Sequence, residues 1–180
     1  QHEKKGQHLL IEAISNLSKK GVNNFTVDFI GDGDSKKHLI DLTKKYNLEE
    51  YVNFLGLKSR EFIFDNLKYY DLLIQPSIYE GFGLTVAEAI LSKVPVLVSK
   101  NDGPLEIVRN GDFGYCSELR SVEDMASKIE YIIKTYASQE MNNKVEEGYI
   151  YCKDNFDIFS TANRYLKLYR SEERRVGKEC

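Results

Sequence analysis

Apolar residues recur along the chain at two spacings, and segments of the two kinds alternate. In residues 8–20 the apolar side chains return every three or four positions, as on a helix with one buried face. Residues 25–30 form a short run rich in aromatic and β-branched residues, which is typical of a strand. This alternation continues to about residue 121, after which only helical spacing is found.

The pattern predicts four strands and seven helices. We expect strands at 25–30, 52–55, 72–75 and 94–98, and helices at 8–20, 35–46, 59–69, 84–91, 122–137, 139–152 and 158–169, with Ser35 capping the second helix. Strand–helix units with short connections favour parallel pairing with right-handed crossovers. Strands that are almost continuously apolar suit a sheet covered on both faces. The predicted fold class is therefore α/β, with a doubly wound, Rossmann-like parallel sheet and a helical C-terminal end.

In such folds, ligands bind beyond the carboxyl ends of the strands. Gly or Pro follows closely after each predicted strand, at Gly31, Gly56, Pro76 and Gly103-Pro104. The loop after the third strand is the richest in candidate chemistry. Gly81 and Gly83 allow the backbone to approach a ligand closely. The free N–H groups of Leu84 and Thr85 at the start of the next helix form an anion site that a diphosphate fits.

Two acidic residues of this segment have alternative interpretations. Glu88 lies among apolar residues of the predicted helix, where an unpaired carboxylate is costly. The two hydroxyls of a ribose could pair with it, or it could face water on an amphipathic helix. Glu80 precedes a glycine in the loop and could face either a ligand or solvent.

Glu80 and Glu88 are separated by seven residues within the run EGFGLTVAEA. This segment closely resembles the signature of retaining GT-B glycosyltransferases of the group-one class. The resemblance covers about residues 5–169, as the C-terminal half of a GT-B fold. Further matches lie at Lys5-Gly6, at Ile30–Gly33, at Val52–Gly56 and at Gly103–Val108.

The resemblance implies a role for each matching residue. Lys5 would hold the donor diphosphate, and Glu80 would contact sugar hydroxyls near the reacting carbon; these two are the expected catalytic residues. The expected donor-binding residues are Gly31, Gly56 and Leu57 beside the nucleobase, Gly81, Phe82 and Gly83 beside the sugar, Leu84 and Thr85 at the phosphates, and Glu88 at the ribose.

The implied reaction transfers a sugar from a nucleoside diphosphate sugar to an acceptor hydroxyl with retention of anomeric configuration. No metal and no further cofactor is expected, because Lys5 and the helix N-terminus supply positive charge for the leaving diphosphate. The variant Asn101-Asp102-Gly103-Pro104 slightly favours UDP over GDP. The resemblance also implies elements that precede this chain: an arginine, the first strand of the domain, and the acceptor-binding domain. The usual setting is surface polysaccharide or glycolipid synthesis.

Charge, cysteine content and hydropathy indicate the class of binding partner and the cellular compartment. The formal net charge of −3 gives no indication of nucleic-acid binding. The three Cys show neither metal-ligand nor disulfide spacing, and no apolar run approaches the length of a membrane span. We therefore expect a cytoplasmic protein, with any peripheral attachment to the inner face of the membrane residing mostly in the preceding domain.

The last segment differs from the rest of the chain. Residues 170–180 have no apolar period and resemble the in-frame translation of a common sequencing adapter. We therefore expect residues 1–169 to be the donor-binding domain and 170–180 to be a non-native tail.

The segment Gly31–Asp34 also resembles motifs of two other kinds of site. Gly31-Asp32-Gly33 resembles half of a dinucleotide fingerprint but lacks its third glycine. Asp32-Gly33-Asp34 resembles an Asp-x-Asp metal motif, although a turn between strand and helix is the simpler interpretation. Two rival functions stay open: a nucleotide-sugar epimerase of similar architecture, and a non-catalytic nucleotide-binding module.

Overall fold

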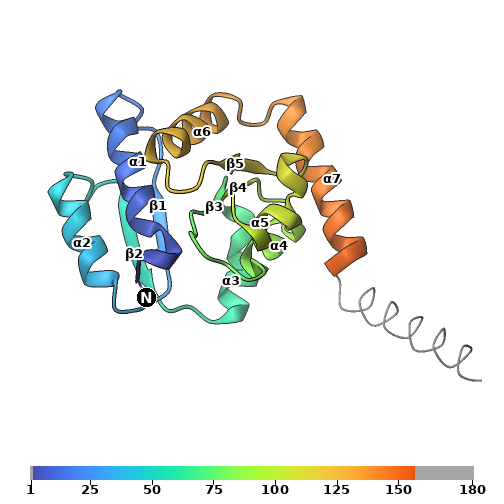
Figure 1. Cartoon of the computed structure of the whole chain (residues 1–180), viewed down its shortest axis with the longest axis horizontal. Helices are drawn as coiled ribbons and strands as arrows, with labels where there is room; N and C mark the ends of the chain where they lie inside the picture. The colour runs from blue at the N-terminus through green and yellow to red at the C-terminus, as the bar shows by residue number, and fades with distance from the viewer. Residues whose placement is uncertain (1, 157–180) are drawn as a thin grey trace, which may run out of the picture.

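The computed structural model describes residues 2–156, and the side chains from Lys4 onward (Figure 1). Its strands are β1 (Val27–Ile30), β2 (Val52–Gly56), β3 (Leu73–Gln75), β4 (Val96–Ser99) and β5 (Tyr115–Ser117). Its α-helices are α1 (Gln7–Lys19), α2 (Lys36–Lys45), α3 (Arg60–Asn66), α4 (Leu84–Leu91), α5 (Asp102–Ile107), α6 (Val122–Lys134) and α7 (Gln139–Phe156). Short 3-10 turns are η1 (His2–Lys5), η2 (Leu67–Tyr69) and η3 (Arg109–Gly111).

All strand pairs are parallel, but the strands form two sheets. One sheet has the order β1-β2, and the other has the order β3-β4-β5. Figure 1 shows β1 and β3 as the neighbouring inner strands of the two sheets. Tyr70, three residues before β3, donates from its hydroxyl to Asp28 Oδ2 of β1 at 2.8 Å, and burial together with this bond raises the pKa of Tyr70 to about 12. The predicted parallel α/β architecture is confirmed.

Helices cover the strands and enclose two apolar clusters. One cluster lies beneath α1, α2 and α6, and its fully buried residues include Ile11, Leu97 and Met125. The other lies around α4 and α7 and includes Val86 and Val98. α1 packs against α6, while α4 packs against α7 (Figure 1). Because β4 contributes Leu97 to the first cluster and Val98 to the second, this strand is covered on both faces, as its apolar sequence predicts.

The structure corrects several details of the predicted elements. Ser35 stands at the start of α2, but its side chain makes no capping hydrogen bond, whereas Ser59 Oγ caps α3 by accepting from Phe62 N at 3.1 Å. The helix expected at 59–69 is divided into α3 and η2. The sequence did not predict β5 or α5. β5 has three residues and is too short to show a period, and α5 contains Gly103-Pro104, which is a breaker signal except in a first turn.

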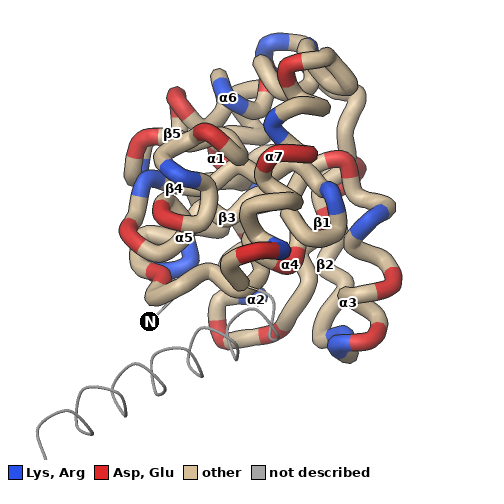
Figure 2. Tube along the Cα trace, turned by 90° about the vertical axis from the view of Figure 1, so that its right-hand side faces the viewer, with Lys and Arg blue, Asp and Glu red and all other residues tan. Residues whose placement is uncertain are grey.

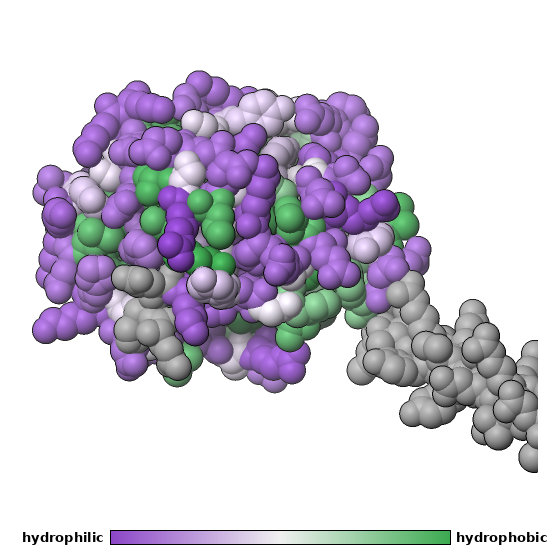
Figure 3. Space-filling view, viewed as in Figure 1, coloured by the Kyte–Doolittle hydropathy of each residue, from purple (hydrophilic) through white to green (hydrophobic). Residues whose placement is uncertain are grey.

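Two expectations concern segments outside the described residues: the helix at 158–169 and the adapter-like tail at 170–180. In the view of Figure 2, Lys and Arg are interspersed with Asp and Glu along the described part of the tube. The face shown in Figure 3 is mostly hydrophilic, with small apolar areas between polar ones. None of the helices within residues 2–156 has an apolar stretch that could cross a bilayer.

Candidate donor-binding site

Close packing of Gly6 places the start of α1 against the loop that follows β3. Gly6 has a φ of 64°, and a Cβ added there would lie 1.9 Å from the carbonyl oxygen of Pro76. Just before it, the carbonyl oxygen of Lys4 accepts hydrogen bonds from Ile78 N at 2.7 Å and Tyr79 N at 3.2 Å. Only glycine allows this approach, and it brings Lys5 next to the loop.

Lys5 and Glu80 meet across this contact. Lys5 Nζ donates to Glu80 Oε2 at 2.7 Å, although the two residues are 75 positions apart in the sequence. The Lys5 side chain is 58% exposed, whereas that of Glu80 is 20% exposed. The structure therefore brings the two expected catalytic residues together and leaves the lysine free to turn toward a ligand.

The N-terminus of α4 is open beside this pair. Gly83 precedes the helix with a φ of 88°, and its carbonyl accepts from Val86 N at 2.9 Å. Within residues 2–156, the N–H groups of Leu84 and Thr85 have no backbone acceptor, and both residues are exposed. Unpaired N–H groups at a helix N-terminus attract anions, so this end of α4 suits a phosphate group.

The loop that carries Gly81 and Gly83, called the glycine loop below, packs against two other segments. A Cβ added at Gly103 would lie 2.6 Å from the carbonyl oxygen of Gly81, so the start of α5 packs directly on the loop backbone. The Phe82 ring contacts Phe156, at the end of α7, edge to face with ring centroids 5.5 Å apart. These contacts fix the shape of the loop before any ligand arrives.

The residues expected beside the nucleobase lie together at the ends of β1 and β2. Gly31 N donates to the carbonyl oxygen of Gly56 at 2.8 Å, which joins the two loops. Leu57 is 76% exposed, and Ile30 is 36% exposed. Exposed apolar groups beside backbone polar groups suit the face and edge of a base.

Glu88 lies on the outer face of α4. The helix buries Val86, Ala87, Ala89 and Ile90, while Glu88 is half-buried and follows Thr85 by three residues on the same face. The carboxylate of Glu88 makes no hydrogen bond or ion pair in the described part of the chain, while the backbone carbonyl of Glu88 accepts from Ser92 Oγ at 2.9 Å. The sequence suggested a carboxylate surrounded by apolar groups; the structure shows instead a partly accessible one on an amphipathic helix.

The Asp32-Gly33-Asp34 segment leads into a turn at Asp34-Ser35, in which Lys36 N donates to the carbonyl oxygen of Gly33 at 3.0 Å. Gly33 N donates to Asp32 Oδ1 at 2.8 Å, and Lys36 Nζ lies 3.6 Å from Asp32 Oδ2. Over residues 2–156, no group of three or more His, Cys, Asp and Glu side chains gathers as metal ligands do. The thiols are not activated either, since burial raises the pKa of Cys116 and that of Cys152, the latter to about 11.

Gln75 also belongs to this cluster, although the sequence did not predict it as a site residue. This residue ends β3, is 9% exposed, and donates from Nε2 to Glu80 Oε2 at 2.9 Å. Its Oε1 accepts from Thr85 Oγ1 at 3.3 Å. An amide that follows the apolar run Leu72–Ile74 immediately before a ligand loop was the available signal.

The fold and the site together define a class of α/β domain. In it, a helix N-terminus and a lysine can bind a phosphate-sized anion, and a neighbouring carboxylate can accept hydrogen bonds from hydroxyl groups. The chain belongs to the family of glycosyl transferases group 1, whose model matches residues 2–149. It is 28% identical over 165 residues to the poly(ribitol-phosphate) alpha-N-acetylglucosaminyltransferase of Staphylococcus aureus, covering 91% of this chain and 32% of that protein. The chain spans less than half the length of the curated relatives it matches.

Solved structures of glycosyltransferases share the fold. The Anabaena protein Alr3699/HepE, solved with UDP and glucose, superposes with a TM-score of 0.83 at 25% identity, covering 95% of this chain and 46% of that one. The crystallised C-terminal domain of the group 1 protein LpcC from Francisella tularensis superposes with a TM-score of 0.74 at 28% identity, covering 88% of this chain and 83% of that domain. This segment therefore corresponds to the C-terminal half of the GT-B fold.

Proposed function

We propose that this chain is the donor-binding part of a glycosyltransferase that transfers a sugar from a nucleoside diphosphate sugar to an acceptor hydroxyl, with retention at the anomeric carbon. The observation that carries the proposal is the Lys5–Glu80 pair beside the open N-terminus of α4. A nucleotide sugar has its charge at the diphosphate and its hydroxyls on the adjoining sugar. The pair offers a cation for the first and a carboxylate for the second.

In this proposal each part of the donor has its own contact. Lys5 and the N–H groups of Leu84 and Thr85 bind the diphosphate, and Glu80 accepts hydrogen bonds from sugar hydroxyls. Glu88, partly accessible and unpaired within residues 2–156, accepts from the ribose. The base lies at Gly31, Gly56 and Leu57, and UDP is the favoured nucleotide because the Anabaena relative was solved with UDP.

The reaction breaks the bond between the anomeric carbon and the diphosphate oxygen and forms a bond from that carbon to the acceptor oxygen. The acceptor proton passes to the leaving diphosphate, whose bridging oxygen gains negative charge. Lys5 and the start of α4 stabilise that charge, and this stabilisation grows as the bond breaks. These groups already supply positive charge, so we propose that the reaction needs no divalent metal.

The acceptor and its binding domain are further proposals. We infer that a second domain outside this chain binds a saccharide or lipid-linked saccharide, in the synthesis of a surface polysaccharide or glycolipid. The Staphylococcus aureus relative, whose name gives poly(ribitol-phosphate) as its substrate, supports this setting. Peripheral membrane contact, if the acceptor is a lipid, would belong to that second domain.

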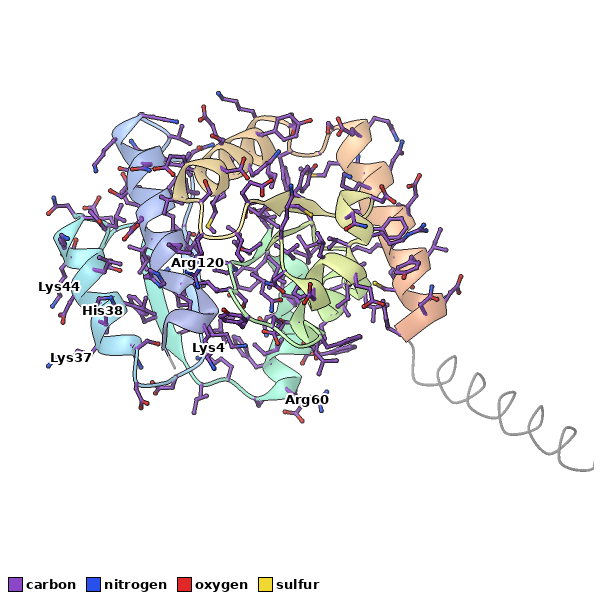
Figure 4. All side chains as sticks on the ribbon, viewed as in Figure 1. Lys4, Lys37, His38, Lys44, Arg60 and Arg120 are labelled. Atoms are coloured by element: carbon purple, nitrogen blue, oxygen red, sulfur yellow. The ribbon has the colours of Figure 1, made fainter. Side chains whose placement is uncertain are left out.

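Lys5→Ala in the longer enzyme that carries this chain tests the proposal. We expect turnover to fall about a hundredfold, which is the scale of losing one preorganised charge at the transition state. Lys4→Ala is the matched control, because the adjacent Lys4 side chain is exposed and has no ion pair or hydrogen bond within residues 4–156 (Figure 4).

Steady-state sugar transfer with and without a chelator is the measurement. Lys4→Ala should remain near wild type, and the chelator should leave activity in place. Turnover of Lys5→Ala within about twofold of wild type would remove Lys5 from the reaction, and loss of activity with the chelator would contradict the metal-free mechanism.

A further inference from the structure

We propose that Gln75 is a positioning residue that holds Glu80 in place for the donor sugar. The inference rests on the proposed function, since it assigns Glu80 to the sugar. It deepens that proposal by naming the side chain that keeps the Glu80 carboxylate in place while Lys5 binds the diphosphate.

The carboxamide of Gln75 spans the glycine loop. Gln75 lies at the end of β3, Glu80 is in the loop, and Thr85 is in the first turn of α4. Gln75 Nε2 donates to Glu80 Oε2 at 2.9 Å, and Gln75 Oε1 accepts from the Thr85 hydroxyl at 3.3 Å. A carboxylate can only accept, so the amide nitrogen must face Glu80 and the oxygen must face Thr85. One side chain therefore connects the sugar end of the site with the phosphate end.

Burial separates the role of Gln75 from that of Lys5. Both residues donate to the same oxygen of Glu80, but the Lys5 side chain is 58% exposed and Gln75 only 9%. When Lys5 turns to a diphosphate, the ion pair with Glu80 weakens. Gln75 is fixed in the strand and stays. No residue in the described part of the chain donates to Glu80 Oε1, which leaves this oxygen for a sugar hydroxyl.

The test compares binding of nucleotide sugars and nucleoside diphosphates to the 180-residue chain. Calorimetric titrations use UDP-glucose, UDP-N-acetylglucosamine and GDP-mannose, each against its own nucleoside diphosphate. Gln75→Leu removes both hydrogen bonds while keeping the volume similar. Ser99→Ala is the matched control, because Ser99 is buried at the end of the adjacent β4 and its hydroxyl has no hydrogen bond within the described residues.

We expect wild type to bind at least one nucleotide sugar more tightly than its nucleoside diphosphate. Gln75→Leu should weaken the nucleotide sugar about tenfold, as for loss of a hydrogen bond to a charged group. It should change nucleoside diphosphate affinity by less than about twofold, while Ser99→Ala changes neither affinity. A merely structural role would weaken both ligands together.

A second variant adds a pH signature. Gln75→Glu places two carboxylates side by side, and like charges disfavour ionisation of both. Lys5 also faces Glu80 and favours its ionised form, so the comparison is made with the ligand bound, when Lys5 is engaged by the diphosphate. On acidification the two carboxylates can then share a proton, which restores a donor to Glu80. Relative to wild type at the same pH, the sugar-specific affinity of Gln75→Glu should recover on acidification, and that of Gln75→Leu should not.

The outcomes distinguish a failure of the proposed function from a failure of the role of Gln75 alone. A folded wild-type chain that binds no nucleotide overturns the proposed function and the inference with it. If the wild-type chain binds nucleoside diphosphates but binds none of the nucleotide sugars more tightly, the assignment of Glu80 is overturned, and with it the role of Gln75. Equal losses for both ligands in Gln75→Leu, or a Gln75→Glu variant without acid recovery, overturn the role of Gln75 alone.

Discussion

At the scale of single residues, the two carboxylates of the site differ in what holds them. The Glu80 carboxylate accepts from Lys5 and Gln75, whereas the Glu88 carboxylate has no hydrogen-bond or ion-pair partner within residues 2–156. An unpaired, half-buried carboxylate contributes little to folding, because no contact is lost when its charge is removed. It can accept two hydrogen bonds from a diol, which gives it more to contribute to ligand binding.

Glu88→Gln should therefore weaken nucleoside diphosphate binding about tenfold, the scale of a hydrogen bond to a charged group, and leave the thermal midpoint almost unchanged. Glu147→Gln is the matched control, since it makes the same charge change at an exposed position of α7. Titration calorimetry and thermal unfolding of the same samples check both parts. Unchanged nucleotide affinity would take Glu88 out of the site.

A motif in the sequence singled out Lys5 and Glu80 as candidate residues, whereas a residue placed by tertiary geometry alone gave no such signal. Glu80 and Lys5 were predicted from a resemblance, and the structure brings them into contact. Gln75 was treated as the end of a strand, because nothing in local sequence shows that its amide reaches residues five and ten positions away. Glu88 was expected among apolar neighbours, since its sequence neighbours are apolar; helical geometry places them on other faces.

At the scale of elements, one glycine contact determines how α1 meets the site. Gly6 combines a left-handed backbone with direct packing on Pro76, so two independent constraints require glycine there. Displacement of this contact would move Lys5 away from the loop. The position of the first helix is therefore part of the site.

Gly6→Ala should destabilise the chain by about 3 kcal/mol, because a β-carbon adds left-handed strain to overpacking against a backbone oxygen. Gly33→Ala is the matched control, since a Cβ there meets nothing within 4 Å and the backbone is not left-handed. Urea unfolding of both variants measures the difference. Equal stability of Gly6→Ala and Gly33→Ala would show that the α1–loop contact is not as tight as described.

The elements themselves were largely predictable. α4 begins and ends where apolar spacing indicated, and each of the four expected strands is present with shifted bounds. β5 and α5 were missed because both are set by tertiary packing. β5 completes the sheet beside β4, and Gly103 of α5 is held against Gly81. Segments of three to six residues are too short for such contacts to produce a recognisable spacing of apolar residues.

At the scale of the whole molecule, the gap in strand pairing is the main feature. β1 pairs only with β2, and β3 only with β4, within the described residues. Unpaired inner edges of parallel strands are costly unless another strand satisfies them. We propose that a preceding segment of the longer protein supplies a parallel strand between β1 and β3, as the resemblance to GT-B glycosyltransferases implies.

The isolated 180-residue chain should therefore be marginally stable, bind nucleotide weakly and transfer no sugar. Transfer needs an acceptor hydroxyl held within reach of the anomeric carbon, and this task belongs to the proposed second domain. A longer version that includes the upstream strand should unfold at higher temperature and bind nucleotide more tightly. Acceptor-dependent transfer by the isolated chain would contradict the assignment of acceptor binding to a second domain.

The central claim is that the donor binds where Lys5, Glu80 and the start of α4 meet. The most direct measurement is titration of the 15N-labelled chain with UDP, followed by the amide resonances. We expect the shift changes to gather at Gly31, Gly56, Leu84 and Thr85. A folded sample that shows no changes would contradict this site, and so would changes that gather instead in the polar groove lined by Glu12, Lys19 and Arg120.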